Sequence, residues 1–340
     1  MKYKAWLSKK IEKTGKILCE ACHQACVLSE GEYGTCGVRF VENGELILSV
    51  YGKVAALHID PIEKKPLFHF LPNSKSLSLG TVGCNFSCKF CQNASISQYP
   101  KERNHNIFGD DLMPNDIVNL ALEYKTKSIS YTYNEPAVFF EYAYDTAKLA
   151  HEKGLKNIFV TSGYETHKAI DTMGSYLDAM NIDIKAFSDD FYKNISGAKL
   201  KPVLDTVEYS YKKGIWVEIT TLIIPTLNDS SEELEKIANF IASISLDMPW
   251  HISAFHPQYK MLDIPRTPHS TLIKAYEIGK KAGLNYVYIG NVLDEDRSST
   301  YCPNCKKKII DRSGYIGEIV QNHLIESKCP YCQTKIAGVL

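Results

Sequence analysis

Cys84, Cys88 and Cys91 have the spacing of a metal site that keeps one position open. They lie in the segment GCNFSCKFC (83–91), which has the pattern Cys-x3-Cys-x2-Cys. Three thiolates can bind three irons of a cubane cluster and leave the fourth iron without a protein ligand. Catalysis at a metal requires such an open position. The alternatives are a structural zinc site that takes its fourth ligand from elsewhere, or three unrelated buried cysteines.

Four cysteines near the end of the chain form two Cys-x2-Cys knuckles, Cys302/Cys305 and Cys329/Cys332. Two such knuckles are typical of a closed tetrahedral site of the zinc-ribbon or rubredoxin-like type. We expect zinc at this site, because the sequence shows no partner for a redox iron. A rubredoxin-type iron is the alternative, since the knuckle chemistry is the same.

The remaining cysteines, Cys19, Cys22, Cys26 and Cys36, have the pattern Cys-x2-Cys-x3-Cys-x9-Cys. Ferredoxin clusters use a tighter cysteine run than this one. We therefore expect zinc here first and an auxiliary iron–sulfur cluster second. The chain has 11 cysteines, and the three groups account for all of them. Clustered cysteines in such a chain are more often metal ligands than disulfides.

The elements that would position the central cysteines alternate between strand and helix. Seven short apolar runs predict buried strands at 78–82, 128–132, 157–161, 180–184, 216–222, 250–254 and 286–289. Amphipathic runs between them predict helices at 137–153, 230–244 and 272–282. Repeated βα units imply a parallel sheet with right-handed crossovers. We expect an α/β fold, a partial TIM-like (β/α)6-type barrel with its site at the carboxyl ends of the strands. A flat doubly wound sheet is the alternative.

The cysteine groups divide the chain into three expected domains. These are an N-terminal four-cysteine module with short strands (1–77), the barrel (78–298) and a C-terminal four-cysteine zinc ribbon (299–340). The chain has 39 basic and 39 acidic residues, so it offers no charge footprint for nucleic acid. It has no apolar run long enough for a membrane span and no apolar secretory segment at its start. We expect a cytoplasmic protein without membrane contact.

The loop GCNFSCKFCQNASIS (83–97) resembles the signature of the radical S-adenosylmethionine (SAM) superfamily. Over nearly its whole length the chain resembles the AmmeMemoRadiSam-system radical SAM enzymes, relatives of the pyruvate formate-lyase activating enzymes. The resemblance implies a radical SAM barrel, a [4Fe–4S] cluster on Cys84, Cys88 and Cys91, and SAM bound at the open iron. It also implies a small electron donor of the flavodoxin or ferredoxin type. A 5′-deoxyadenosyl radical would then take hydrogen from an unidentified protein or small-molecule substrate.

The same resemblance assigns SAM contacts on the first strands of the barrel. Glu135, with Asn134 beside it, is expected to meet the SAM amino group, although Tyr-Asn-Glu-Pro stands where the family has a Gly-Gly-Glu-like motif. Ser162 is expected to bind the SAM carboxylate or ribose. Phe90, just before the third cysteine, is expected to line the cofactor site. The structural alternatives are that Glu135 favours a helix dipole and that Ser162 caps a helix.

Charged residues on the later strands complete the expected site. Asp183 and Lys185 lie two apart in a predicted strand, so their side chains share one face. They resemble the Asp-x-Lys motif of activating enzymes, which implies contacts with the SAM ribose and carboxylate. A purely structural ion pair is the alternative. Glu218 on the fifth strand and His256 at the end of the sixth are also expected to bind the cofactor, His256 near the adenine.

Three classes of function are compatible with these patterns. The leading hypothesis is an enzyme, a radical SAM oxidoreductase with an unidentified substrate. A glycyl-radical-enzyme activase, which acts on a protein backbone, is its alternative. A non-catalytic zinc-ribbon adaptor for nucleic acid is disfavoured by the zero net charge and by the open three-cysteine site. A simple electron carrier is disfavoured by the large βα body.

Overall fold

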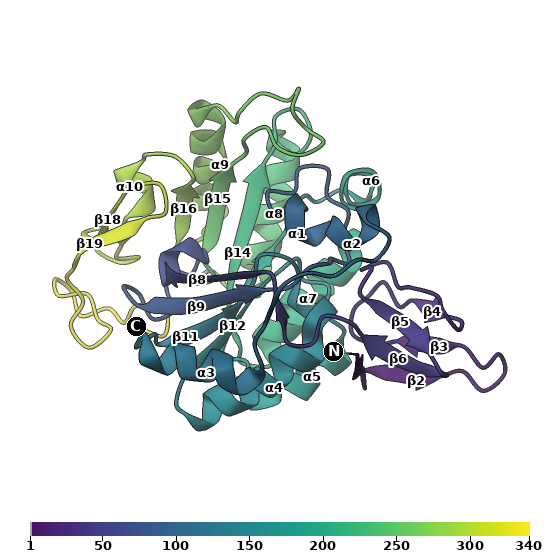
Figure 1. The fold of residues 1–340 in the computed structure, drawn as a ribbon. Helices are drawn as coiled ribbons and strands as arrows, with labels where there is room; N and C mark the ends of the chain where they lie inside the picture. The colour runs from purple at the N-terminus through teal and green to yellow at the C-terminus, as the bar shows by residue number, and fades with distance from the viewer. Residues whose placement is uncertain (1) are drawn as a thin grey trace.

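The computed structural model describes residues 2–340, and one eight-stranded sheet forms its centre (Figure 1). Seven consecutive strands pair in parallel: β9 (Lys75–Gly80), β11 (Ser128–Tyr131), β12 (Lys156–Thr161), β13 (Ala179–Asp183), β14 (Trp216–Ile223), β15 (Trp250–Ala254) and β16 (Val287–Gly290). The strand β8 (Ala56–Pro61) is antiparallel to β9 and forms one edge. Within the described chain, β8 and β16 remain separate edges, so the α/β barrel is partial, as expected.

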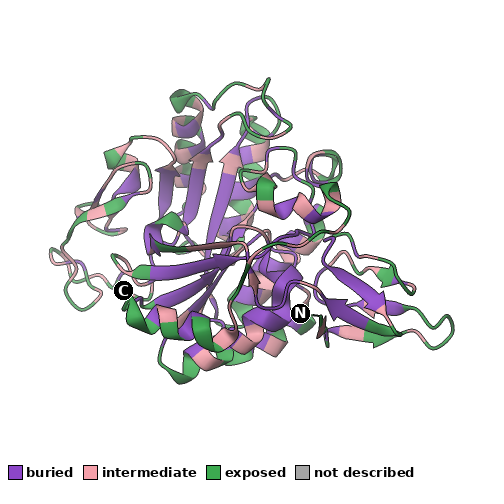
Figure 2. Ribbon diagram, viewed as in Figure 1, coloured by how far each residue is buried: buried purple, intermediate pink, exposed green. Residues whose placement is uncertain are grey.

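Helices follow the parallel strands and cover the outside of the sheet. The longer ones are α3 (Pro114–Glu123), α4 (Phe140–Glu152), α5 (His167–Met173), α7 (Leu200–Lys212), α8 (Ser231–Ile244) and α9 (His269–Lys281). Short helices are α1 (Ala94–Ser97), α2 (Tyr99–Glu102), α6 (Asp189–Phe191) and α10 (Glu295–Ser298). In Figure 2 the parallel strands of the central sheet are mostly buried and the outer faces of the helices are exposed. This difference follows from the sequence, because buried parallel strands are apolar on both faces and the helices on one.

The first parallel strand differs most from its predicted range. The sequence predicts 78–82, whereas β9 spans Lys75–Gly80. The strand begins earlier because polar residues pair inside the barrel: the Ser76 and Ser130 hydroxyls are 2.6 Å apart and buried. It ends at Gly80, where a Cβ atom would lie 2.6 Å from the Thr132 carbonyl oxygen. A strand prediction that relies on the pattern of apolar residues does not detect buried serines of this kind.

The N-terminal segment forms small antiparallel sheets beside the barrel. One contains β1 (Tyr3–Lys4), β5 (Arg39–Glu42) and β6 (Glu45–Leu48), and another contains β2 (Ser8–Lys10), β3 (Ile17–Cys19) and β4 (Val27–Leu28). A third pairs β7 (Lys53–Val54) with β10 (Asp110–Asp111). In Figure 1 the strands β2–β6 lie together at the right of the barrel. The segment after them, which includes β8, belongs to the large sheet although it falls within 1–77.

The C-terminal tail packs against the opposite edge of the barrel, near β16 (Figure 1). Its sheet contains β17 (Thr300–Tyr301), β18 (Lys308–Ser313) and β19 (Glu318–Asn322). Phe68, Tyr286 and Tyr288 form one buried cluster with tail residues. The Arg312 guanidinium lies 4.3 Å from the Phe68 ring and donates a hydrogen bond to the Phe68 carbonyl oxygen at 2.9 Å. The tail is therefore docked on the barrel rather than free.

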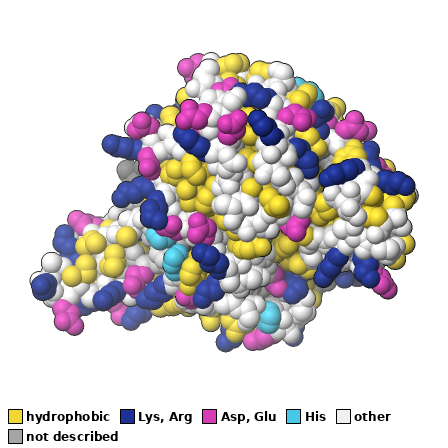
Figure 3. Space-filling model, turned by 180° about the vertical axis from the view of Figure 1, so that it is seen from behind, with side chains coloured by type: hydrophobic (Ala, Val, Ile, Leu, Met, Phe, Trp, Pro, Cys, Tyr) yellow, Lys and Arg dark blue, Asp and Glu magenta, His cyan; other side chains and the backbone are white. Residues whose placement is uncertain are grey.

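The surface carries mixed charges. On the face shown in Figure 3, basic and acidic side chains are interspersed, consistent with the zero net charge of the sequence. In residues 2–340, no helix combines the length and the apolar character that crossing a membrane requires.

Candidate active site

One large cavity opens at the carboxyl ends of the parallel strands. Its volume is about 510 Å³, and residues that follow β9, β11, β12 and β13 line it together with residues of β14, β15 and β16. The three central cysteines, Cys84, Cys88 and Cys91, all lie in its wall. In barrel enzymes this end of the strands holds the active site, because the connecting loops converge there.

The cysteine loop is fixed by glycine and by amide side chains. Gly83 has φ +94°, a conformation that favours glycine, and places the chain for the turn into Cys84. The Asn134 amide donates to the Gly83 carbonyl oxygen at 2.7 Å, and its oxygen accepts from the Thr81 amide at 3.2 Å. Asn93 in turn donates to the Tyr133 carbonyl oxygen at 2.7 Å. Asn134 lines the cavity, as expected of a site residue, but its side-chain groups bind the cysteine loop.

Four other expected residues also line this cavity: Phe90, Ser162, Asp183 and Lys185. The Lys185 ammonium lies 2.7 Å from the Asp183 carboxylate and 5.9 Å from the centre of the Phe90 ring. Burial opposes the charge on Lys185, but the attraction of Asp183 and Cys88 outweighs it and raises the pKa of the ammonium above its usual value. The structure thus places a fixed positive charge beside the central cysteines.

Glu135 is close to the cavity but does not line it. Its carboxylate is fully buried and accepts hydrogen bonds from the Thr161 hydroxyl at 2.8 Å and the Ser162 amide at 2.9 Å. Burial raises the pKa of Glu135, and these donors act in the opposite direction. In this structure Glu135 therefore orients the Thr161–Ser162 turn at the end of β12.

Glu218 lies beneath the cavity rather than in its wall. Its carboxylate accepts from the amides of Phe68 and His69 at 2.9 and 2.8 Å, and the Trp216 indole donates to it at 2.9 Å. Two residues of this network reach the cavity: Phe68, and His251, whose Nε2 lies 2.7 Å from Glu218. His256 also falls outside the cavity lining.

Two segments that the sequence analysis did not assign to the site form part of its wall. Glu63, Lys64 and Lys65 come from the turn after β8, and Tyr315 and Ile316 come from the turn between β18 and β19. Neither segment carries a motif, so only the tertiary packing reveals them. The Tyr315 carbonyl oxygen accepts from the Asn291 amide at 3.1 Å, which ties the tail to the end of β16.

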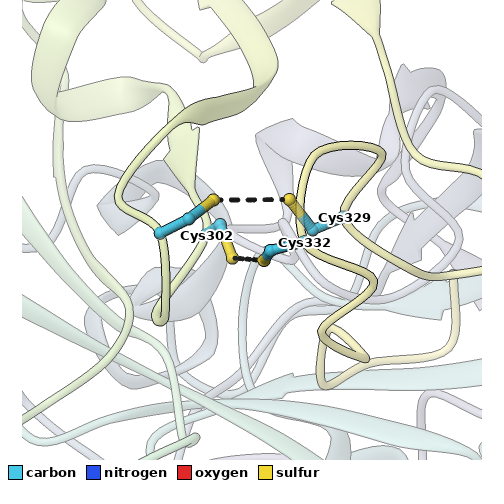
Figure 4. Close-up of side chains that lie close together, drawn as sticks. Cys302, Cys329 and Cys332 are labelled. Carbon is cyan, nitrogen blue, oxygen red and sulfur yellow. Dashed lines mark hydrogen bonds between the residues drawn. The ribbon is translucent and has the colours of Figure 1, made fainter.

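The C-terminal cysteines form a compact group whose sulfur atoms can surround a single metal ion. The sulfur atoms of Cys302, Cys305, Cys329 and Cys332 all lie within 4.8 Å of one another (Figure 4). The Cys302–Cys332 and Cys305–Cys329 sulfur distances are both 3.6 Å. A tetrahedral zinc with Zn–S bonds of about 2.3 Å places its sulfurs about 3.8 Å apart. The donor set therefore fits one tetrahedral ion, in agreement with the predicted closed site.

Comparisons with known proteins agree with this architecture. Residues 78–241 match the model of the radical SAM superfamily. An uncharacterized protein of Methanocaldococcus jannaschii is 45% identical over 298 residues, which cover 87% of this chain and 88% of that protein. A second protein of that organism, provisionally named a glycyl-radical enzyme activating enzyme, is 28% identical over 64% of this chain and 80% of its own length. The pyruvate formate-lyase-activating enzyme of Clostridium pasteurianum is 27% identical over 48% of this chain and 67% of its own length.

A solved structure shows the same fold. The radical SAM methyltransferase of Sphaerobacter thermophilus superposes with a TM-score of 0.51 at 16% identity, over 65% of this chain and 67% of that one. A partial parallel barrel with thiols and charged groups at the carboxyl ends of its strands is the architecture of a barrel enzyme. The chain belongs to the radical SAM superfamily. It is an enzyme, and the family implies a [4Fe–4S] cluster and SAM. The interpretation as a non-catalytic adaptor is thereby set aside.

Proposed function

We propose that Cys84, Cys88 and Cys91 bind the [4Fe–4S] cluster, that SAM binds beside it in the cavity, and that the enzyme takes a hydrogen atom from a substrate bound there. The observation that carries this proposal is the convergence of the three thiols and the Asp183–Lys185 pair on one cavity. Within the described residues these three sulfurs, unlike the C-terminal four, do not gather within 4.8 Å of one another. Their donor set and spacing suit a cubane with one open iron better than a single ion.

When bound, the cluster and SAM supply reductive cleavage of the sulfonium to a 5′-deoxyadenosyl radical. The residues of the chain bind SAM and the substrate, orient them and exclude water. Lys185 offers an ammonium that suits a carboxylate, and Asp183, being partly exposed, offers acceptors for hydroxyl or amino groups. Ser162 adds a small polar group on the same wall. The volume of about 510 Å³ is that of a small-ligand site.

The test is cleavage of SAM by the anaerobically reconstituted enzyme with dithionite, followed by quantification of 5′-deoxyadenosine. We expect product from the wild type and none from the combined Cys84→Ala, Cys88→Ala, Cys91→Ala variant. The C-terminal zinc content and the thermal unfolding temperature of the variant provide the control for folding. Equal product from both proteins would contradict the assignment of these cysteines.

A second candidate function is activation of a glycyl radical enzyme, in which the substrate is a protein backbone. The similarity to proteins named as activating enzymes favours it. A glycyl radical enzyme from the same organism, incubated with this enzyme, SAM and reductant, would then show a glycyl radical by electron paramagnetic resonance. Formation of 5′-deoxyadenosine without that signal would favour another substrate.

A further inference from the structure

The four N-terminal cysteines surround a cavity of their own. Cys19 ends β3, Cys22 and Cys26 lie in the turn before β4, and Cys36 lies just before β5. All four line one small cavity at the junction between the N-terminal sheets and the barrel. Asn85, the residue after Cys84, lines the same cavity from the barrel side. The fold thus collects these cysteines around a common space, which the sequence spacing alone does not establish.

The spacing of these sulfurs differs from that of the C-terminal group. Across residues 2–340, the C-terminal four gather within 4.8 Å of one another, whereas no three of the N-terminal sulfurs do. A single zinc ion requires sulfurs about 3.8 Å apart, given Zn–S bonds of about 2.3 Å. A cubane spreads its thiolates further, because each binds a different iron at a different corner. The wider spacing is shared with Cys84, Cys88 and Cys91.

The cavity also offers a buried donor that faces a cysteine. The Asn85 side chain is fully buried, and its Nδ2 atom makes no hydrogen bond of good geometry, but the side chain acts on the Cys22 thiol and lowers its pKa against the effect of burial. A buried amide without a partner costs free energy, so its presence in the wall points to a missing acceptor. The inorganic sulfides and thiolates of an iron–sulfur cluster are such acceptors. On the other side of the cavity, the Thr35 amide donates to the Cys26 sulfur at 3.5 Å.

We propose that Cys19, Cys22, Cys26 and Cys36 hold a second [4Fe–4S] cluster in which every iron has a protein ligand. This replaces zinc as the expectation for the site. With no open iron, the cluster binds no SAM and serves as a one-electron centre. Because Asn85 in its wall directly follows Cys84, which lines the large cavity, the second cluster lies next to the cluster of the proposed function.

Contacts between the two cysteine segments support this neighbouring position. The Gln24 side chain donates to the Asn85 carbonyl oxygen at 2.8 Å. The Asn85 Oδ1 atom lies 3.8 Å from the Cys84 sulfur. A Cβ atom on Gly83 would lie 2.9 Å from the Cys36 carbonyl oxygen, so the two segments are in direct contact. The role of the second cluster as a one-electron centre that serves the catalytic cluster rests on the proposed function. The metal content of the N-terminal site does not depend on it.

The experiment measures metals in a protein that lacks the catalytic cluster. The combined Cys84→Ala, Cys88→Ala, Cys91→Ala variant, isolated and reconstituted anaerobically, keeps all four N-terminal cysteines. We expect about four irons and four acid-labile sulfides per chain in this variant, about eight of each in the wild type, and about one zinc in both. Mössbauer spectra of the variant should show a [4Fe–4S] cluster. About two zinc ions per chain and no iron in the variant would overturn the proposal.

A further substitution separates a built cluster from adventitious iron. Cys26 is the least buried of the four, so Cys26→Ala, which removes the ligand atom, disturbs packing least. Added to the triple variant, it should remove most of the iron and leave the zinc unchanged. Iron that stays at about four per chain would be adventitious and would contradict the proposal. Absence of 5′-deoxyadenosine from the wild type would count against the proposed function alone, because the iron count of the triple variant does not depend on activity.

Discussion

The Nε2 atom of His251 lies 2.7 Å from the Glu218 carboxylate; both side chains are buried, and His251 lines the cavity while Glu218 lies beneath it. His251 also stacks with the Tyr288 ring at 5.3 Å between centres and meets the edge of Phe68 at 4.7 Å. Glu218 therefore holds His251 at the cavity floor and, through two backbone amides, the Phe68–His69 segment. One buried carboxylate connects the barrel strands to the chain that precedes them.

The substitution Glu218→Gln should destabilise the protein. The carboxylate accepts only, whereas a glutamine amide would bring an NH2 group among existing donors, which costs about 2–3 kcal/mol. The measurement is the free energy of unfolding from urea denaturation at pH 7. Glu208→Gln, on the exposed face of α7, is the matched control and should change stability by less than about 0.5 kcal/mol. An equal effect of both substitutions would contradict the role of Glu218.

The same carboxylate should make stability dependent on pH. Burial raises the pKa of Glu218, but hydrogen bonds and the nearby imidazoles outweigh it, so the folded-state pKa lies below the usual value for a glutamate. A carboxyl with a depressed pKa contributes its stability above the unfolded-state pKa and loses it as pH falls through the lower folded-state pKa. The stability difference between wild type and Glu218→Gln should therefore be constant near neutrality and shrink below about pH 4.5. A difference that grows on acidification would contradict this.

Lys185→Met tests whether the Asp183–Lys185 pair binds the cofactor or only stabilises the fold. If Lys185 binds the SAM carboxylate, its loss removes a charged hydrogen bond worth about 1.5–3 kcal/mol, which corresponds to a rise in Kd of roughly 10–100-fold. The measurement is calorimetric titration of the reconstituted enzyme with SAM. Lys201→Met, which removes an exposed ion pair with Asp205 on α7, is the control. Lower stability with unchanged SAM affinity would identify a structural ion pair.

The sequence predicts this site unevenly, for physical reasons. Strands and the residues at their ends follow from apolar runs, so the three cysteines, Asp183 and Lys185 could be placed at the cavity beforehand. The sequence position of Glu135 and Glu218 does not reveal their burial, because burial depends on which backbone amides other segments bring to them. The parts of the cavity wall at Lys65 and Tyr315 come from turns, whose residues show no periodic pattern of apolar side chains. Metal type depends on sulfur spacing in space, which the intervals Cys-x2-Cys do not determine.

Docking of the C-terminal tail should depend on Gly317 more than on Gly314. Both have φ +72°, so alanine at either strains the backbone equally. A Cβ on Gly317 would lie 2.4 Å from the Phe68 ring, whereas the nearest atom to one on Gly314 is the Glu318 carboxylate at 3.4 Å. Gly314→Ala should cost about 1 kcal/mol, and Gly317→Ala should cost more by about 1–3 kcal/mol. Limited proteolysis should show faster cleavage after residue 300 in Gly317→Ala only.

Gly83→Ala should separate the N-terminal sheets from the loop that carries the three central cysteines. Gly83 has φ +94°, and a Cβ there would lie 2.5 Å from Val38 and 2.9 Å from the Cys36 carbonyl oxygen. Alanine must therefore shift the chain just before Cys84, and we expect a loss of at least about 2 kcal/mol in stability and lower iron occupancy. Gly154→Ala is the control, because it shares a positive φ of 76° but has no atom within 4 Å of the added Cβ. Adding Val38→Ala should restore little, since the carbonyl oxygen of Cys36 remains. Full iron content in Gly83→Ala would show that the two cysteine segments move independently.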